Sequence, residues 1–224
     1  MEISLSEEEI KPRLIVVAGP NGVGKTSITQ LLLYHEWMQG CEYINPDYIA
    51  LHEYGNWDNT ENFIKAAEIA KQRREDCLKK KKNLAFETVF STVEKTEFIR
   101  KALESGFFVR FFFICVNDPT ICAQRVAQRV MHGGHDVPIS RIIDRYYRSF
   151  NNCIIIANHI DRAYFYDNST NNDKPHLLFR LKKGTPKIHT QNEMPFWGKK
   201  MFNHIITESQ SSDFDGYNCI RPKI

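Results

Sequence analysis

Residues 19–26 read Gly-Pro-Asn-Gly-Val-Gly-Lys-Thr and fit the phosphate-binding pattern G-x-x-x-x-G-K-[ST]. Glycines let backbone N–H groups turn toward a phosphate without a clash from Cβ atoms, and the start of a following helix adds partial positive charge. Lys25 can reach the β- and γ-phosphates, and the Thr26 hydroxyl can bind Mg²⁺. We therefore expect a bound nucleoside triphosphate, held by Gly19, Pro20, Asn21, Gly22, Val23, Gly24, Lys25, Thr26 and Ser27.

The sequence on either side supports this interpretation. The apolar, β-branched run at residues 14–18 predicts a buried parallel strand. Residues 26–38 place apolar side chains at helical spacing, so the motif lies between a strand and a helix, as a phosphate loop requires. A plain glycine-rich turn is the alternative, but every fixed position of the motif is filled.

Asp47 is a candidate catalytic residue outside this loop. In Asn45-Pro46-Asp47, asparagine suits a helix cap, proline suits the first helical position, and an acid is favoured by the helix dipole. The residues before Asn45 predict a strand, so Asp47 would also face the γ-phosphate from a strand's carboxyl end. There it can accept the proton of an attacking hydroxyl. The two interpretations are compatible.

Glu87 ends a third apolar strand, and Thr88 follows it. Burying a carboxylate without a partner is costly. Near a phosphate loop the natural partner is a Mg²⁺-bound water or a substrate hydroxyl, and an ion pair with an arginine is the structural alternative. We expect Glu87 and Thr88, together with Asp47, to contact the substrate.

Arginines recur along two predicted helices joined by a Gly-Gly link. Arg125 and Arg129 are spaced i,i+4 in the first helix, and Arg141, Arg145 and Arg148 follow at i, i+4 and i+7 in the second. Such a pair of helices is typical of a mobile lid that closes over phosphates and supplies positive charge. Solvated helix faces are the alternative for each arginine. For the cluster of arginines as a whole we favour the functional interpretation.

Strand-like and helix-like segments alternate along the chain, which favours an α/β fold with a mainly parallel sheet flanked by helices. We expect strands at 13–18, 43–45, 84–87, 107–116, 163–166 and 177–181, and helices at 25–38, 59–82, 94–105, 119–132 and 138–159. The predicted architecture is a three-layer P-loop NTPase sandwich with a helical lid at about 120–150. A kinase domain would span residues 1–182, and the polar residues 183–224 would form a C-terminal extension, a tail or surface wrap of unknown role.

The predicted fifth strand is followed by Tyr166-Asp167-Asn168-Ser169. An Asx-type turn explains these residues individually, and we prefer that interpretation. A loop near the adenine, or support for the phosphate loop from behind, is the functional alternative.

The composition is that of an ordinary globular domain, with 224 residues, 42% of them hydrophobic and 25% charged. The net charge of +3 does not call for nucleic acid, and no aromatic residues accompany the lysine run at 79–82. The acidic N-terminus lacks an apolar signal core, and the longest apolar run, 107–116, is too short to cross a membrane. We expect a cytoplasmic protein with no membrane partner, whose six cysteines, without a C-x-x-C pair, stay reduced.

Five segments taken together resemble the zeta toxin family, and more narrowly its short chromosomal zeta-toxin-like ATPases. The segments are the phosphate loop, residues 44–47, Glu87-Thr88, Gly133-Gly134-His135-Asp136-Val137-Pro138 and residues 166–169. The resemblance runs from about residue 13 to about residue 182. It implies a P-loop kinase that uses ATP and Mg²⁺.

The resemblance also implies roles for residues and partners. The better-known members phosphorylate a sugar hydroxyl of UDP-N-acetylglucosamine. By position, Lys25 would hold phosphates, Thr26 would hold Mg²⁺, Asp47 would act as general base, and Glu87 would act on the substrate or metal side. Lid arginines would clamp the γ-phosphate, and for this catalytic role we select Arg125, Arg129 and Arg145, with Arg141 in reserve. A nucleotide sugar and an antitoxin protein would be the partners. The segments that bind the nucleotide sugar in the large toxins find no match in this shorter chain.

Two other functions stay open at this point. A kinase of another metabolite or nucleoside would use the same residues. A nucleotide-gated switch protein belongs to a different class and would hydrolyse ATP slowly. A guanine-binding Asn-Lys-x-Asp motif is absent, and the Asp-x-x-Gly at 213–216 lies far along the chain from the phosphate loop. The lid arginines favour transfer over switching.

Overall fold

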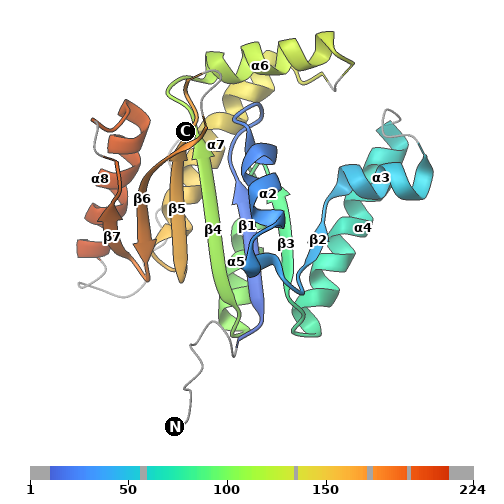
Figure 1. Cartoon of the computed structure of the whole chain (residues 1–224), viewed down its shortest axis with the longest axis horizontal. Coiled ribbons are helices and arrows are strands. Elements are labelled where there is room, and N and C mark those ends of the chain that lie inside the picture. The colour runs from blue at the N-terminus through green and yellow to red at the C-terminus, as the bar shows by residue number, and fades with distance from the viewer. Residues whose placement is uncertain (1–10, 56–59, 134–135, 171–173, 191–192, 212–224) are drawn as a thin grey trace.

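The computed structural model describes residues 11–55, 60–133, 136–170, 174–190 and 193–211. Within these residues a seven-stranded sheet has the order β2-β3-β1-β4-β5-β6-β7 (Figure 1). Its strands are β1 (Arg13–Ala18), β2 (Glu42–Ile44), β3 (Leu84–Thr88), β4 (Phe108–Cys115), β5 (Arg162–Asp167), β6 (His176–Lys182) and β7 (Thr185–Ile188). The pairs from β2 to β5 are parallel, and β6 and β7 pair antiparallel at the edge. The prediction of a mainly parallel α/β sheet is confirmed.

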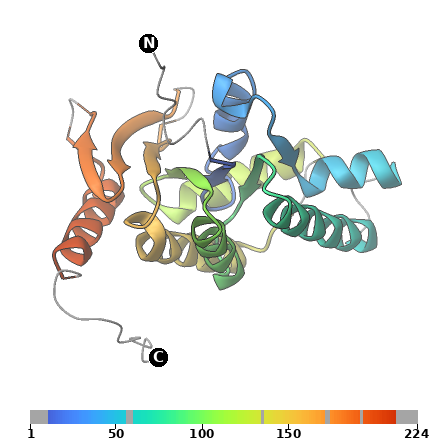
Figure 2. The same cartoon turned by 90° about the horizontal axis from the view of Figure 1, so that it is seen from below.

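Helices lie on both faces of this sheet. They are α2 (Lys25–Leu33), the short 3₁₀ helix η1 (Glu36–Met38), α3 (Pro46–Tyr54), α4 (Thr60–Lys79), α5 (Val93–Glu104), α6 (Pro119–Met131), α7 (Ile139–Ala157) and α8 (Phe196–Ser211). Seen from below, α4, α5, α7 and α8 cover one face and α2 covers the other (Figure 2). This arrangement confirms the predicted three-layer sandwich.

The core is centred on β4, which is buried along its whole length. β4 is hydrogen-bonded to β1 on one side and β5 on the other, so it has no exposed edge. Helices shield both of its faces, which explains why its sequence is continuously apolar apart from Arg110 instead of alternating. The ends of these central strands therefore form a rigid edge on which loops can be positioned.

The helix predicted at residues 25–38 is two helices in the structure. α2 ends at Leu33, and the His35 side chain accepts a hydrogen bond of 3.2 Å from the Trp37 backbone N–H, which caps η1. The Trp37 ring then lies 3.6 Å from the guanidinium carbon of buried Arg110. The local cap and this cation–π contact turn the chain where helical periodicity alone predicted continuation.

The lid prediction is met by α6 and only part of α7. α6 lies across the carboxyl ends of the central strands (Figure 1). α7 starts beside it but returns over the sheet, where Phe150, Cys153 and Ile156 are buried. The second half of α7 therefore belongs to the core layer. Gly134 and His135, in the link between the two helices, lie outside the described residues.

The prediction of a weakly patterned tail or surface wrap after residue 182 is wrong for residues 185–188 and 196–211, which form β7 and α8. β7 pairs with β6, and α8 buries Trp197, Met201 and Ile205. These three apolar residues recur every fourth position, so they form one face of a helix that packs against α7. The predicted domain boundary at residue 182 stays a prediction, but the sheet continues past it.

Two further observations concern the chain as a whole. Among the described residues, no helix combines the length and the apolar character needed to cross a membrane. The five described cysteines are free thiols, and four of them are buried, as predicted.

Candidate active site

The phosphate loop joins the end of β1 to the start of α2, in the order that the sequence predicts. Gly24 caps α2 with a φ of 87°, a left-handed conformation that favours glycine. The Lys25 ammonium lies over the loop, and Nζ donates hydrogen bonds to the carbonyl oxygens of Gly19 at 2.9 Å and Pro20 at 2.8 Å. The loop therefore holds its lysine directly above the backbone that would bind phosphates.

The surroundings of Lys25 change its pKa. Burial lowers the pKa of Lys25 to about 8. The Glu87 carboxylate opposes this change and the Arg129 guanidinium adds to it, so both groups lie close enough to act on the lysine. Charged residues of β3 and α6 thus both act electrostatically on the lysine of the phosphate loop.

Gly19 is a position where an added methyl group cannot fit. Its φ is 149°, and a Cβ atom there would lie 2.2 Å from the backbone oxygen of Ile114 in β4. We expect Gly19→Ala to lower the free energy of unfolding by about 1–3 kcal/mol, because the strand cannot move away. Urea unfolding measures this loss. Gly106→Ala is the control, since Gly106 also has positive φ, at 80°, but a Cβ would meet nothing within 4 Å. Equal losses in the two variants would contradict the clash.

Glu87 ends β3 and is held by a tyrosine. The Tyr43 hydroxyl donates to Glu87 Oε1 at 3.1 Å, and Asn45 Nδ2 donates to the same tyrosine oxygen at 3.1 Å. Burial and the neighbouring carboxylate both raise the pKa of Tyr43, so the phenol stays a proton donor at neutral pH. The sequence predicted a substrate, a metal-bound water or an arginine as the partner of Glu87. In the structure Tyr43 is a partner of Glu87. The sequence did not predict this pair, because tyrosine is common in strands and nothing marks this one.

Asp47 lies in the first turn of α3, on the segment that supports Glu87. Asn45 Oδ1 accepts the Asp47 backbone N–H at 2.8 Å and Pro46 begins the helix, so the helix-start interpretation is confirmed. The Asp47 side chain is exposed to solvent. The neighbouring Tyr48 ring meets Tyr43 edge-on at 5.9 Å. Residues 43–48 thus place the exposed Asp47 carboxylate next to the tyrosine that binds Glu87. The role of Asp47 as a base stays a prediction.

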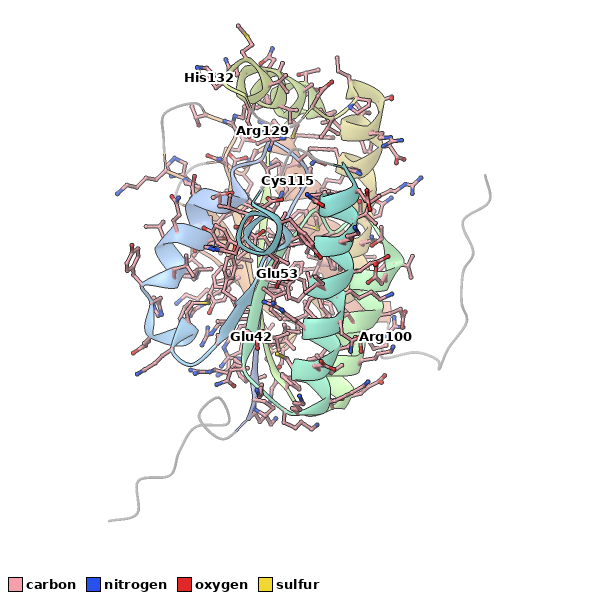
Figure 3. The ribbon with its side chains drawn as sticks, turned by 90° about the vertical axis from the view of Figure 1, so that its right-hand side faces the viewer. Glu42, Glu53, Arg100, Cys115, Arg129 and His132 are labelled. Carbon is pink, nitrogen blue, oxygen red and sulfur yellow. The ribbon has the colours of Figure 1, made fainter. Side chains whose placement is uncertain are left out.

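The three selected lid arginines differ in their surroundings. Arg145 Nη1 donates to Asn21 Oδ1 in the phosphate loop at 3.4 Å. Arg125 Nη2 donates to the carbonyl oxygen of Thr170 at 3.3 Å. Arg129 acts on Lys25 through its charge, and Figure 3 shows it on α6 above Cys115, the last residue of β4.

The other two arginines of α7 differ from these. Arg148 forms an exposed ion pair with Asp144 at 2.9 Å, and Arg141 is exposed. An exposed i,i+4 pair of this kind contributes little and fits the solvated-face alternative. The helical spacing predicted that these arginines form one stripe. In the structure Arg145 lies on the side of α7 next to the phosphate loop, whereas Arg141 and Arg148 are exposed.

The turn after β5 supports the phosphate loop. Asn168 Nδ2 donates to the carbonyl oxygen of Val23 at 2.8 Å. The Asx-type turn is also present, because the Ser169 backbone N–H donates to Asp167 Oδ2 at 3.3 Å. The turn and the support of the phosphate loop are therefore both present, and proximity to adenine stays a prediction. The signal for loop support was the position of Asn168 at the carboxyl end of a parallel strand.

The residues present are suited to Mg²⁺ bound with a nucleotide. Thr26 is exposed at the start of α2, and the Glu87 carboxylate acts on the neighbouring Lys25. Mg²⁺ prefers oxygen ligands and is commonly held by one or two protein groups together with phosphates and water. Thr26 would hold the ion, and Glu87 could orient a water bound to it.

Known proteins resemble this chain in sequence pattern and in fold. The family model described as Zeta toxin matches residues 2–173. A solved structure of the PezAT chromosomal toxin–antitoxin system of Streptococcus pneumoniae is 15% identical with a TM-score of 0.55, and the match covers 90% of this chain and 87% of that one. A structure of AvrRxo1-ORF1:-ORF2 with ATP is 15% identical with a TM-score of 0.56, over 87% of this chain and 63% of that one. No curated protein matches the sequence.

These comparisons have different weight. At such low identity the two solved structures show a common fold and no more. The family model spans most of the chain and includes the phosphate loop, Asp47, Glu87 and the turn at 167–169, whereas α8 follows the matched region. The chain therefore belongs to the zeta toxin family and is a P-loop phosphotransferase.

Proposed function

We propose that this protein transfers the γ-phosphoryl group of ATP to a hydroxyl of a small molecule in the cytoplasm. The observation that carries the proposal is a lysine that hydrogen bonds hold over the phosphate loop and that charged groups from two other segments influence. Glu87 from β3 and Arg129 from α6 both alter the pKa of Lys25 in the phosphate loop. Phosphoryl transfer needs this combination, because positive charge stabilises the transferring group while a carboxylate positions the acceptor or its metal.

Each candidate residue has a distinct role in this reaction. Lys25 and the arginines Arg125, Arg129 and Arg145 would neutralise charge on the phosphates. Asp47 would accept the proton of the attacking hydroxyl, because its exposed carboxylate is free to meet a substrate. When bound, Mg²⁺ would neutralise further charge between the β- and γ-phosphates, with Thr26 as its protein ligand.

UDP-N-acetylglucosamine is the acceptor that we propose first. Membership of the zeta toxin family supports it. The acceptor side also offers Asp47, Glu87 and Thr88 as hydrogen-bonding groups for sugar hydroxyls, with Tyr48 exposing an aromatic ring beside them. Another metabolite or a nucleoside would meet the same groups, so the acceptor has to be identified by experiment.

The test is phosphoryl transfer from γ-labelled ATP with Mg²⁺, offering UDP-N-acetylglucosamine beside a panel of sugars and nucleosides. We expect label on one acceptor at a rate above that of water. Label on a different member of the panel would replace the acceptor and keep the kinase. Release of free phosphate alone, unchanged by any acceptor, would instead favour a nucleotide-gated switch.

We also propose an antitoxin protein as a partner. The support is the likeness of the fold to the structure of the PezAT toxin–antitoxin system. If this chain is such a toxin, expression of the wild type should stop the growth of host cells, and co-expression of its antitoxin should restore growth. Unimpeded growth with active enzyme in the cells would contradict toxicity and leave the kinase reaction intact.

The lowered pKa of Lys25 predicts that ATP binding takes up protons in mildly alkaline solution. Below about pH 7 the lysine is protonated with or without ATP, since its pKa is about 8 in the free protein. Bound phosphates favour the charged amine and raise that pKa. At about pH 8.5 ATP should therefore bind with uptake of a fraction of a proton, and its affinity should fall as pH rises through about 8.

Calorimetry in two buffers of different ionisation enthalpy measures this uptake. Lys25→Arg is the matched control, because arginine keeps its charge throughout this range. Uptake of the same size in Lys25→Arg would show that another group takes the proton.

A further inference from the structure

The turn at residues 167–170, which we call the β5 turn, contacts the phosphate loop through Asn168. The side-chain amide of Asn168 donates to the Val23 carbonyl oxygen at 2.8 Å, and its backbone N–H donates to the Cys115 carbonyl oxygen at 3.0 Å. A Cβ atom on Gly24 would lie 2.4 Å from the same amide nitrogen. The amide therefore fills the space behind the loop and holds it against the end of β4.

The same turn contacts the start of the lid and one of its arginines. Ser169 Oγ accepts the backbone N–H of Asn117 at 2.9 Å, just before α6 begins. The Thr170 carbonyl oxygen accepts Arg125 Nη2 at 3.3 Å. A displacement of the β5 turn would thus act on the phosphate loop and on α6 together.

Asp167 connects this turn to α8. It is 9% exposed, and a buried carboxylate needs hydrogen-bond donors. Trp197 Nε1 donates to Asp167 Oδ1 at 2.7 Å, and Ser169 donates to the carboxylate through its hydroxyl at 2.6 Å and its backbone N–H at 3.3 Å. Trp197 is 2% exposed and packs edge-on against Phe113 of β4 at 6.3 Å.

We propose that Trp197 is a positioning residue for nucleotide binding and that α8, which carries it, contributes to the affinity for the nucleotide. The indole N–H fixes the Asp167 carboxylate, which fixes Ser169 and the turn, and the turn places the Asn168 amide under the phosphate loop. Trp197 lies beyond residue 173, where the family model stops matching. Through this route it acts on the phosphate loop. The inference rests on the proposed function to the extent that ATP is the nucleotide.

The chemistry of this chain explains why a tryptophan suits the position. Indole donates one hydrogen bond and accepts none, so it satisfies a carboxylate without competing for the donors of the turn. The ring is held by packing in the core, which gives the N–H a fixed direction. Phenylalanine would keep much of the packing and remove only the donor, and this separates the proposed link from the general stability of α8.

The experiment compares the dissociation constant for Mg·ATP of the wild type with that of Trp197→Phe. We expect Trp197→Phe to bind ATP about two- to tenfold more weakly, since a single hydrogen bond contributes in that range. Phe202→Leu is the matched control in the same helix. Phe202 packs edge-on against Phe179 of β6 at 5.1 Å, so its loss weakens the attachment of α8 without removing the indole donor. We expect Phe202→Leu to lower the melting temperature and to leave ATP affinity unchanged.

A double-mutant cycle with Asn168→Ala then tests the route. If Trp197 acts through the Asn168 amide, Trp197→Phe should add little to the loss of affinity already caused by Asn168→Ala. Independent, additive losses would overturn the proposed route. Unchanged ATP affinity in Trp197→Phe, or equal weakening in Phe202→Leu, would overturn the inference itself. A wild-type chain that binds no ATP would overturn the proposed function as well, so the two failures are distinguishable.

Discussion

Replacing Asp47 by asparagine should lower the rate constant of phosphoryl transfer by about 10²–10⁴-fold, the usual contribution of a general base. Asparagine has nearly the same shape but cannot accept the proton of the attacking hydroxyl. The helix start should survive, because Asn45 caps α3 through the backbone N–H of residue 47 and not through its side chain. The dissociation constant for ATP should therefore stay close to that of the wild type.

The measurement is transfer of labelled γ-phosphate to the identified acceptor, with ATP binding followed separately by calorimetry. Glu94→Gln is the matched control, because Glu94 is an exposed acid in the first turn of α5. It reports the loss of a favourable charge at a helix start without the proposed proton transfer. Equal losses of transfer and of ATP binding in Asp47→Asn would show that Asp47 is only structural.

Replacing Lys25 by methionine should have the second large effect. The ammonium lies over the loop that would bind the phosphates, so its removal should lower the transfer rate by about 10²–10³-fold and weaken ATP binding. Methionine has a similar length, so the loss would report the charge more than the volume. The same transfer assay and a calorimetric titration with ATP measure both effects.

The stability of Lys25→Met serves as the internal control. The pKa of Lys25 is about 8 in the folded protein and about 10.5 when unfolded. The folded state therefore binds fewer protons between these values, so the charged lysine costs folding free energy below about pH 8, and this cost is relieved as pH rises toward 10.5. We expect Lys25→Met to be no less stable than the wild type at neutral pH. A cooperative loss of folding in this variant would contradict that expectation.

If the chain is toxic, the same variant separates toxicity from mere overexpression. Growth arrest by the wild type and normal growth with equal amounts of Lys25→Met would tie toxicity to phosphoryl transfer. Arrest by both forms would show that the effect on cells does not depend on the kinase site.

The sequence alone determined the functional features that are formed by residues close together in the chain. The phosphate loop can be predicted because strand, glycines, lysine and helix follow one another within residues 13–33. The helix start at Asn45 is equally local, since the cap bonds to a residue two positions away. The parallel sheet follows from alternating apolar segments, and with it the edge where Asp47 and Glu87 had to be sought.

The tertiary structure alone decided which polar residues meet. The Tyr43–Glu87 bond joins residues 44 positions apart, and the Asn168–Val23 bond joins residues 145 positions apart. No local pattern distinguishes such residues from an ordinary strand tyrosine or a turn asparagine, because their partners lie far away in the sequence, in another strand or in the phosphate loop. The same holds for the arginines of α7, which share a helical spacing although Arg145 lies beside the phosphate loop and Arg148 is exposed to solvent. The burial of Trp197 against Asp167 likewise required the packing of α8, since a residue's environment is fixed by the elements packed around it and not by its neighbours in sequence.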